Sequence, residues 1–266
     1  MAVKLAVSGI SKVYQIPILE KIEFDVEEGE FVCILGPNGC GKTTLLRIIA
    51  GLDPPSSGQV RLDGRAVSYT GNWNRHIGFV FQEDRLLPWL TLEDNVALVL
   101  KPLGVGPRER RQTARRYLQF VGLHGFEQYY PSRVSGGMRQ RAAIARALAI
   151  EPDLLLMDEP FGGLDPQNRR IMQAEVRRIW AETRKTILFV THSIEEAVAI
   201  GTALIMISAR PGSVREIARN DGSQDALKLA TRLDTMIMEE VLRQQGTPVD
   251  RWGATTRTTH PQGGQA

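Results

Sequence analysis

One stretch, residues 31–52 with the sequence FVCILGPNGCGKTTLLRIIAGL, limits the possible folds of this chain more than any other. It opens with the apolar run Phe31 to Leu35, passes through the glycine-rich segment Gly36 to Thr43, and continues with helical spacing. A strand, a glycine turn and a helix start form the context in which a GxxxxGK[ST] match is meaningful. The stretch therefore predicts a phosphate-binding loop in an α/β fold.

The residue types of this loop suit an anion. Gly36, Gly39 and Gly41 let the backbone curl, so that successive N–H groups point at one place. The positive end of the following helix adds to the same spot. Lys42 can neutralise outer phosphates, and the Thr43 hydroxyl can ligate the Mg²⁺ that accompanies them. A chance glycine turn would leave the lysine, the hydroxyl and the flanking elements unexplained.

Length and composition describe an ordinary globular protein. The 266 residues allow one large or two small domains, and 42% hydrophobic with 24% charged residues is usual for a soluble chain. No apolar run approaches the roughly 18 residues of a membrane span. The first residues, MAVKLAVSGISK, lack the apolar core of a signal peptide. We therefore expect the chain to stay in the cytosol unless a partner holds it at a membrane.

The chain is mildly basic, with a formal net charge of +3 and a pI near 9.0. One arginine cluster stands on a predicted helix whose other side carries Tyr117, Leu118 and Val121. It lacks the interleaved aromatics of a nucleic-acid-binding stripe, so we interpret it as a solvated helix face and expect no nucleic acid partner. The cluster consists of Arg108, Arg110, Arg111, Arg115 and Arg116.

Strand and helix patterns alternate along the rest of the chain. Predicted strands span 3–7, 21–26, 59–62, 77–81, 153–157, 186–190, 203–207 and 214–217. Predicted helices span 138–150, 165–183 and 226–242, and 92–130 is helical with breaks near Pro102 and Pro107. The runs 153–157 and 186–190 are continuously apolar, as in a parallel sheet. From Gly246 the chain is polar, and we expect a mobile tail there.

Two residues near the loop allow two interpretations each. Tyr14 precedes the loop and could stack on an adenine ring, but a lone tyrosine on a strand usually packs. Gln82 follows the predicted strand 77–81, where a neutral amide could reach both a metal and a water. It could equally be an ordinary strand end. The local sequence does not decide either case.

A second anion-type nest precedes the helix 138–150. Ser135 can cap that helix, and Gly136 and Gly137 let a phosphate approach the bare N–H groups. The alternative is a plain capped helix. Two such nests can serve one nucleotide only if they meet, either within one chain or across two chains.

Three polar residues follow the apolar strands. Asp158 and Glu159 stand at the carboxyl end of one strand, where ligands collect in open α/β sheets. Asp158 would serve the Mg²⁺ shell and Glu159 would polarise a water that attacks the γ-phosphate. They could instead cap a helix, but Pro160 and the glycines after it indicate a loop. His192 ends the next strand and is either structural or a hydrogen-bond partner of the γ-phosphate.

Together these motifs resemble the nucleotide-binding subunit of an ATP-binding cassette (ABC) transporter from Val3 to about Ile217. The resemblance rests on the segments 36–43, 134–140, 154–159 and 162–165 with Gln82 and His192. It implies an α/β fold, a P-loop NTPase with a RecA-like core, an antiparallel β subdomain and an inserted helical subdomain. The implied nucleotide-binding domain spans 1–219 with the helical insertion at about 84–151. A C-terminal helix and tail at 220–266 lie outside it.

The resemblance also implies that two subunits face head to tail, with ATP between the phosphate loop of one and the nest of the other. It makes Tyr14 the adenine-stacking residue, and it makes Gln82 a sensor of Mg²⁺ and of the membrane partner. ATP-binding residues are then Tyr14, Gly36, Pro37, Asn38, Gly39, Cys40, Gly41, Lys42, Thr43, Thr44, Gln82, Ser135, Gly136 and Gly137. Residues for Mg²⁺ are Thr43, Gln82 and Asp158, and catalytic residues are Glu159, His192 and Lys42.

Within this family the segments 86–89, 135–141, 157–164 and 208–212 are similar to the importers of nitrate, sulfonates and taurine. The implied partners are a second nucleotide-binding subunit, two transmembrane permease subunits and an extracytoplasmic solute-binding protein. The implied location is peripheral, at the cytoplasmic face of the inner membrane. Val134 stands where the signature usually has leucine, and Met138 where it usually has glutamine, the latter a frequent change in this subgroup. Gly163 stands where alanine is common, which puts little in doubt.

Two other classes of protein share parts of this pattern. A non-transport cassette ATPase would carry a long coiled coil or two cassettes, and a soluble P-loop kinase would not need the Ser135 nest. Cys40 lies inside the loop, so we expect a thiol alkylator to inhibit unless ATP is bound. Cys33 and Cys40 have no metal-ligand spacing and are expected to be reduced thiols.

Overall fold

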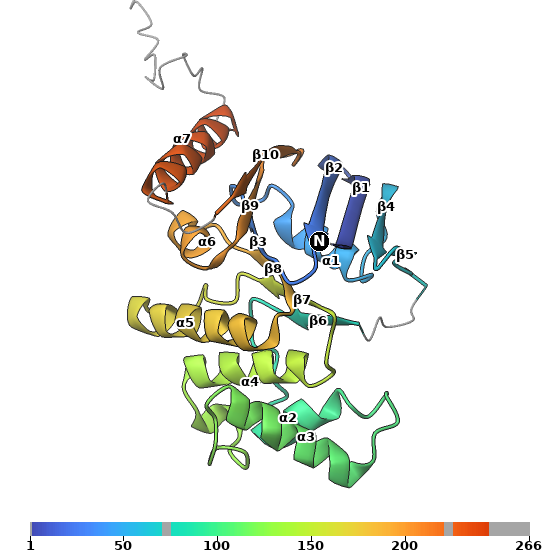
Figure 1. Cartoon of the computed structure of the whole chain (residues 1–266), viewed down its shortest axis with the longest axis vertical. Helices are drawn as coiled ribbons and strands as arrows, with labels where there is room; N and C mark the ends of the chain where they lie inside the picture. The colour runs from blue at the N-terminus through green and yellow to red at the C-terminus, as the bar shows by residue number, and fades with distance from the viewer. Residues whose placement is uncertain (1, 71–75, 221–225, 245–266) are drawn as a thin grey trace, which may run out of the picture.

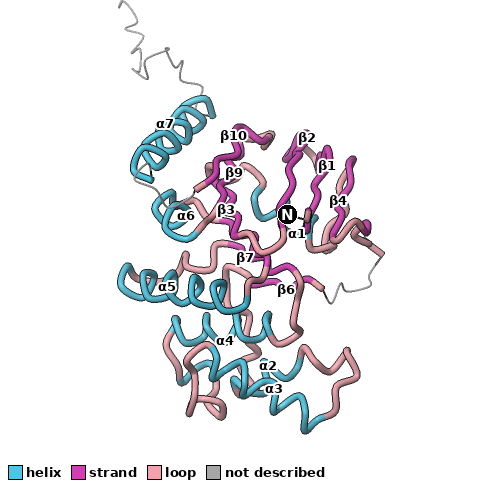
Figure 2. Tube along the Cα trace, in the orientation of Figure 1, coloured by secondary structure: helices cyan, strands magenta, loops and turns pink. Residues whose placement is uncertain are grey.

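The computed structural model describes residues 2–70, 76–220 and 226–244 of the chain. Two sheets and several helices form the fold (Figure 1). The antiparallel strands β1, β2 and β4 lie at the upper right of the view, and helices α2, α3 and α4 lie at the bottom. Strands β6, β7 and β8 of the central sheet lie between these two groups, and β9 and β10 lie higher in the view. Figure 2 shows the same division between strands and helices.

The central sheet has six strands in the order β10-β9-β3-β8-β7-β6. The strands from β9 to β6 are parallel, and β10 pairs antiparallel with β9. All residues of β3, β7, β8 and β9 are buried, which explains their continuously apolar sequences. The strands span Phe31–Leu35 (β3), Ile77–Val80 (β6), Leu154–Asp158 (β7), Thr186–Val190 (β8), Ala203–Ile207 (β9) and Val214–Arg219 (β10).

The two faces of the central sheet bury separate cores. In β3, Phe31, Cys33 and Leu35 belong to the core shared with the helices. Val32 and Ile34 belong to the core shared with α1 and the second sheet. Alternate side chains of a strand point to opposite faces, so both cores hold this strand in place. The phosphate loop therefore leaves a strand that is fixed from both sides.

The second sheet is antiparallel, in the order β2-β1-β4-β5. Its first two strands are longer than the sequence predicted, because backbone pairing continues through register shifts, as at Ile10 with Ile22 and Lys12 with Leu19. The alternating apolar pattern fades there, so periodicity alone ends β1 too early and begins β2 too late. The strands span Val3–Val13 (β1), Pro17–Glu27 (β2), Ser57–Leu62 (β4) and Arg65–Ala66 (β5).

The helices α2, α3 and α4 pack against one another and against the helix-facing core. The prediction that 92–130 is helical with breaks is correct for α2 and α3. It is wrong beyond Phe120, because Gly122 and Gly125 adopt φ values of 72° and 86° and the chain turns there. These elements are α2 (Leu92–Leu98), α3 (Pro107–Phe120), the short 3₁₀ helix η1 (Pro131–Arg133) and α4 (Gly136–Leu148).

Four further helices lie within the described residues: α1 (Lys42–Ile49), α5 (Pro166–Thr183), α6 (Ile194–Ile200) and α7 (Ala226–Gln244). Helix α7 contacts α6 and buries Leu233. The buried Glu240 carboxylate accepts from the backbone N of Ala209 at 2.9 Å and pairs with Arg215 at 3.1 Å. Within the described residues, none of the helices has the length and apolarity that crossing a membrane requires. The tail expected from Gly246 lies outside the described residues, and the division into subdomains stays a prediction.

Candidate functional site

The phosphate loop connects the end of β3 to the start of α1. Gly39 and Gly41 adopt φ values of 79° and 104°, in the left-handed region that favours glycine. A Cβ on Gly41 would lie 2.6 Å from a side-chain carbon of Leu19, and one on Gly36 would lie 2.7 Å from the Ile207 carbonyl oxygen. Any side chain at these two positions would clash, so the close-packed loop explains why the sequence has glycine there.

Lys42 reaches back across the loop. Its ammonium donates hydrogen bonds to the carbonyl oxygens of Gly36 at 2.8 Å and Pro37 at 3.1 Å, and the residue is only 5% exposed. The Lys42 Nζ also lies 3.9 Å from Glu159 Oε1. The positive charge is therefore held inside the loop, next to a carboxylate supplied by the far end of β7.

The loop borders a small cleft of about 230 Å³. Its lining comes from the phosphate loop and α1, with Ile18 on one side and Glu159 on the other. Backbone N–H groups, a lysine and a carboxylate thus share one opening. The lining residues are Ile18, Asn38, Gly39, Gly41, Lys42, Thr43, Thr44 and Glu159.

Thr43 and Asp158 form a second contact between the loop and β7. The Thr43 Oγ1 donates to Asp158 Oδ1 at 2.9 Å. Burial raises the pKa of Asp158 above its ordinary value, although the hydrogen bond from Thr43 lowers it in part. A hydroxyl and a carboxylate at hydrogen-bond distance are oxygen ligands of the kind that Mg²⁺ prefers, so the donor set fits that ion.

Glu159 adopts a strained backbone conformation with φ of 42°. Its backbone N donates to the Val190 carbonyl at 3.0 Å, and its carboxylate Oε2 lies 2.9 Å from His192 Nδ1. Strain of this kind costs about 1–3 kcal/mol and is found where surrounding structure and function require it. The fold therefore aims this carboxylate between Lys42 and His192, as expected when two neighbouring parallel strands end at the same edge.

The segment after His192 is held by a buried carboxylate that the sequence did not reveal. Thr191 Oγ1 donates to Glu196 Oε2 at 2.6 Å, and Arg169 Nε lies 3.5 Å from Glu196 Oε1. Ser193 caps α6 by accepting from the backbone N of Glu196 at 3.2 Å. The carboxylate of Glu196 turns toward Thr191 instead of closing a capping box, and it thereby fixes the strand end that carries His192.

Gln82 lies two residues beyond the end of β6, next to the loop that follows Glu159. A Cβ on Gly162 would lie 3.7 Å from Gln82 Nε2. The segment after Gln82 is tied to α4, because Arg139 Nε donates to Asp84 Oδ2 at 2.9 Å. This pair was missed in the sequence, where neither residue has a distinctive spacing.

Tyr14 and Cys40 do not line the cleft in this structure. The Tyr14 ring is 55% exposed, its hydroxyl donates to Asp53, and Lys12 Nζ lies 4.6 Å from the ring centroid. Stacking on adenine therefore stays a prediction. The Cys40 thiol is fully buried, and burial raises its pKa. The expectation that an alkylator reaches Cys40 is wrong for this structure, because the side chain is buried in the core shared with α1 and the second sheet.

The nest at Ser135 begins α4 as predicted. Its Oγ accepts from the backbone N of Met138 at 3.3 Å, and both Ser135 and Gly136 are exposed. A Cβ on Gly137 would lie 3.8 Å from Asn168 Oδ1, which places the nest beside the start of α5. Among the described residues, no hydrogen bond or ion pair joins this nest to the phosphate loop. The chain brings together Lys42, Glu159 and His192, but not the nest.

Several known proteins resemble this chain along most of its length. The sequence model of the family described as ABC transporter matches residues 19–162. An uncharacterized ABC transporter ATP-binding protein of Methanocaldococcus jannaschii is 43% identical over 255 residues, which are 91% of this chain and 94% of that protein. A taurine import ATP-binding protein of Rhizobium johnstonii is 52% identical over 203 residues, which are 76% of each chain.

A solved structure agrees with the fold. A dimeric ATP-binding cassette in a post-hydrolysis state, bound to ADP and phosphate, has a TM-score of 0.71 and 33% identity, covering 82% of this chain and 100% of that one. This chain therefore belongs to the family of ABC transporter ATP-binding proteins, whose members bind and hydrolyse ATP. The predicted fold class and the resemblance drawn from the motifs are confirmed.

Proposed function

We propose that this chain powers the import of taurine, an aliphatic sulfonate, nitrate or a similar small solute by hydrolysing ATP. Relatives named as taurine and aliphatic sulfonate import ATP-binding proteins, at 40–52% identity, support this group of transporters. The segments 86–89 and 208–212 of this chain support the same group. The solute itself is selected by the membrane subunits and by a solute-binding protein outside the cytosol.

The phosphates of ATP bind at the phosphate loop. The backbone N–H groups of 38–44 and the Lys42 ammonium offer the positive charge there. Binding exchanges the hydrogen bonds from Lys42 to the carbonyls of Gly36 and Pro37 for contacts with phosphate oxygens. Thr43 and Asp158 would hold Mg²⁺, with Gln82 as a further oxygen donor, and the ion would supply charge neutralisation at the outer phosphates.

The hydrolytic step uses Glu159 and His192. Glu159 accepts a proton from the attacking water as the oxygen of that water bonds to the γ-phosphorus. The bond between this phosphorus and the oxygen shared with the β-phosphate breaks, so that ADP and inorganic phosphate leave. His192 is within hydrogen-bond distance of that carboxylate and can donate to an oxygen of the γ-phosphate. The single observation that carries this assignment is the position of the Glu159 carboxylate on the cleft wall, between Lys42 and His192.

A second copy completes the site. Ser135 and Gly136 of the nest are exposed, Gly137 is buried behind them, and the solved cassette of 33% identity is a dimer. In a two-fold pair, each nest would meet the γ-phosphate held by the other chain. ATP then holds the chains together and hydrolysis lets them part.

The membrane partner would dock on an apolar groove of about 360 Å³ between the central sheet and α2. Phe79 and Phe81 stack in it with centroids 4.3 Å apart, and Leu98 and Val99 form its other wall. The groove lies next to the Gln82 segment, so a permease held there could sense the state of the cleft. Two permease subunits would place the pair at the cytoplasmic face of the inner membrane.

Reconstitution tests this function. The chain is co-expressed with the membrane proteins encoded beside its gene, and the complex is placed in liposomes with the solute-binding protein. We expect ATP-dependent uptake of radiolabelled taurine, alkylsulfonate or nitrate, with none in a Lys42→Ala complex. Stable ATPase activity without any membrane partner or uptake would favour the alternative, a non-transport ABC ATPase.

A further inference from the structure

A cavity of about 720 Å³ lies between α2 and the first half of α3, in a part of the molecule with no role in the proposed mechanism. Five of its ten lining residues are cationic and one is acidic. From the sequence we interpreted these arginines as a solvated helix face. They are exposed, but in the folded chain they line a concave surface. The charged lining residues are Asp94, Lys101, Arg108, Arg110, Arg111 and Arg115.

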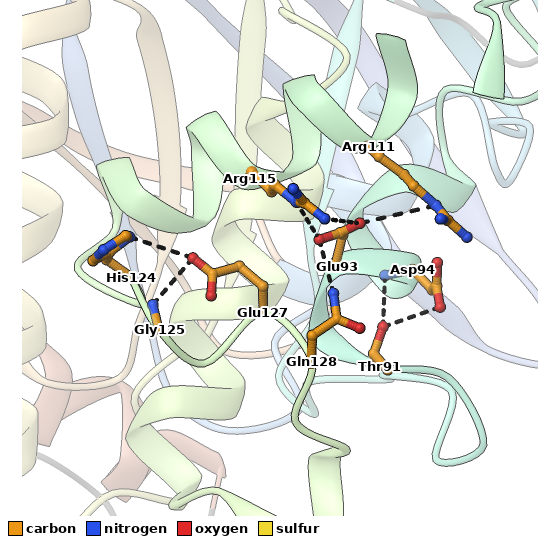
Figure 3. Close-up of polar contacts among 9 residues, drawn as sticks. All are labelled: Thr91, Glu93, Asp94, Arg111, Arg115, His124, Gly125, Glu127 and Gln128. Atoms are coloured by element: carbon orange, nitrogen blue, oxygen red, sulfur yellow. Dashed lines mark hydrogen bonds and ion pairs between the residues drawn. The ribbon is translucent and has the colours of Figure 1, made fainter. Parts of the chain in front are cut away.

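A buried carboxylate holds part of this wall in place. Glu93 on α2 is only 2% exposed, and Arg115 Nε donates to its Oε2 at 2.6 Å. Arg111 Nε lies 3.9 Å from Glu93 Oε1, and Gln128 Nε2 donates to Oε2 at 3.0 Å. Figure 3 shows the two arginines reaching down to Glu93 from α3. Because a guanidinium has five N–H donors, the contacts with Glu93 leave further N–H donors of both arginines for a ligand and fix the directions of these donors.

The remaining cations of the cavity are Lys101, Arg108 and Arg110. Among the described residues, no ion pair involves Lys101, Arg108 or Arg110. The one acidic lining residue, Asp94, already accepts from the Thr91 hydroxyl at 3.0 Å (Figure 3). Positive charges gathered in a concave site raise the local concentration of anions. The cavity therefore favours a multiply charged anion.

The start of α3 adds to this field. Pro107 has no N–H and the Arg110 N–H donates to the Gly106 carbonyl at 2.9 Å, so the N–H groups of Arg108 and Glu109 are those that keep their donor capacity. The Glu109 carboxylate in the same turn offsets part of the positive field of the helix start. Ala97, Leu98 and Pro107 supply an apolar part of the wall. Charged and apolar lining together suit an organic molecule better than a bare inorganic ion.

We propose that this cavity, here called the arginine pocket, binds a molecule that carries at least two phosphate groups. Guanidinium groups recognise phosphate oxygens in pairs, and several arginines at one cavity suit more than one such group. Leu98 lines both the arginine pocket and the apolar groove on α2. An occupant would therefore lie beside the proposed permease surface, where a soluble organic polyphosphate or a diphosphate lipid headgroup could influence docking.

Direct binding tests this proposal, with inositol hexakisphosphate as the soluble probe. The phosphate loop is first silenced with Lys42→Ala, so that the probe reports on the arginine pocket. In that background, Arg108→Glu with Arg110→Glu should weaken binding at least about tenfold, because two charge-assisted contacts become repulsive. The matched control, Arg61→Glu with Arg65→Glu, makes the same charge change on β4 and β5 and should leave binding unchanged.

Phosphatidylcholine vesicles with and without cardiolipin distinguish a diphosphate lipid headgroup from a soluble polyphosphate as the ligand of the arginine pocket. Arginine-dependent cosedimentation with cardiolipin vesicles supports a lipid headgroup, and probe binding without vesicle binding supports a soluble ligand. Thermal unfolding and ATP binding of the arginine variants in the wild-type background check that they fold. Equal weakening by both double variants, or no saturable binding in the Lys42→Ala background, overturns the proposal and leaves the ATPase function untouched.

Discussion

The phosphate loop and the Ser135 nest are both helix starts that offer N–H groups to an anion, but the side chains that surround them differ. The phosphate loop encloses the Lys42 ammonium and faces Glu159. The nest has only the Ser135 hydroxyl, which caps its own helix, while Arg139 turns away to Asp84 and the Val134 carbonyl. The difference supports the proposal that the loop holds phosphate by itself, whereas the nest adds to phosphate that another chain already holds.

The largest expected effect comes from Glu159→Gln in the phosphate-loop site. Removing the carboxylate that polarises water should lower turnover by about 10²–10⁴-fold and leave ATP binding intact. ATPase rates together with nucleotide titration check this. The matched control is Glu195→Gln, because Glu195 lies exposed on α6. This variant should retain normal turnover. Near-normal ATPase activity of the Glu159 variant would remove its assigned role.

A large effect is also expected at the nest, but on pairing. Ser135→Arg should abolish ATP-driven dimers in sedimentation, because the bulky side chain removes the helix cap and blocks the approach of a phosphate to the nest. The control Ser132→Arg, on the exposed face of η1, should pair normally. ATP binding by the single chain should survive both changes.

Mixing variants sharpens the comparison further. If the sites form between chains, a Ser135→Arg chain mixed with a Lys42→Ala chain contains one intact composite site and regains ATPase activity. A chain with both changes, mixed with wild type, leaves every mixed site defective. If each chain used its own nest, the first mixture would stay inactive and the proposed pairing would be wrong.

A moderate effect is expected on stability at Asp158. Its raised pKa means that the native state binds the proton more tightly than the unfolded state, so stability falls as pH rises through that pKa. The Asp158→Asn variant removes this loss, so its free energy of unfolding should exceed that of the wild type by on the order of 1 kcal/mol at neutral pH. Below about pH 4 the two free energies of unfolding should differ little. Denaturant titrations at both pH values measure it. Loss of Mg²⁺-dependent ATP binding should accompany the gain, and equal gains at both pH values would contradict the assigned cause.

The smallest effect is expected at Cys40. Its buried thiol with a raised pKa should react slowly with iodoacetamide, at the same rate with and without ATP. Mass spectrometry of the labelled residue measures that rate. Rapid labelling that ATP suppresses would show that the loop opens far more than this structure indicates.

Local patterns predicted much of the site because the chemistry is contiguous. The loop residues from Gly36 to Thr43 stand in one run, and Asp158 with Glu159 directly follows a buried strand. Contacts between residues outside such runs were not predicted in this way. Arg139 pairs with Asp84, and Thr191 donates a hydrogen bond to Glu196. These residue types are common on protein surfaces, and their spacing in the sequence does not predict either contact.

By itself, the sequence determined the phosphate loop, the buried strands and the start of the nest helix, because each depends on periodicity or turn chemistry within a few residues. Only the tertiary structure decided that Glu159 lies between Lys42 and His192, that the Cys40 thiol is buried, and that scattered arginines surround a cavity. Such outcomes depend on which elements pack together, and that follows from the burial of whole faces rather than from local spacing.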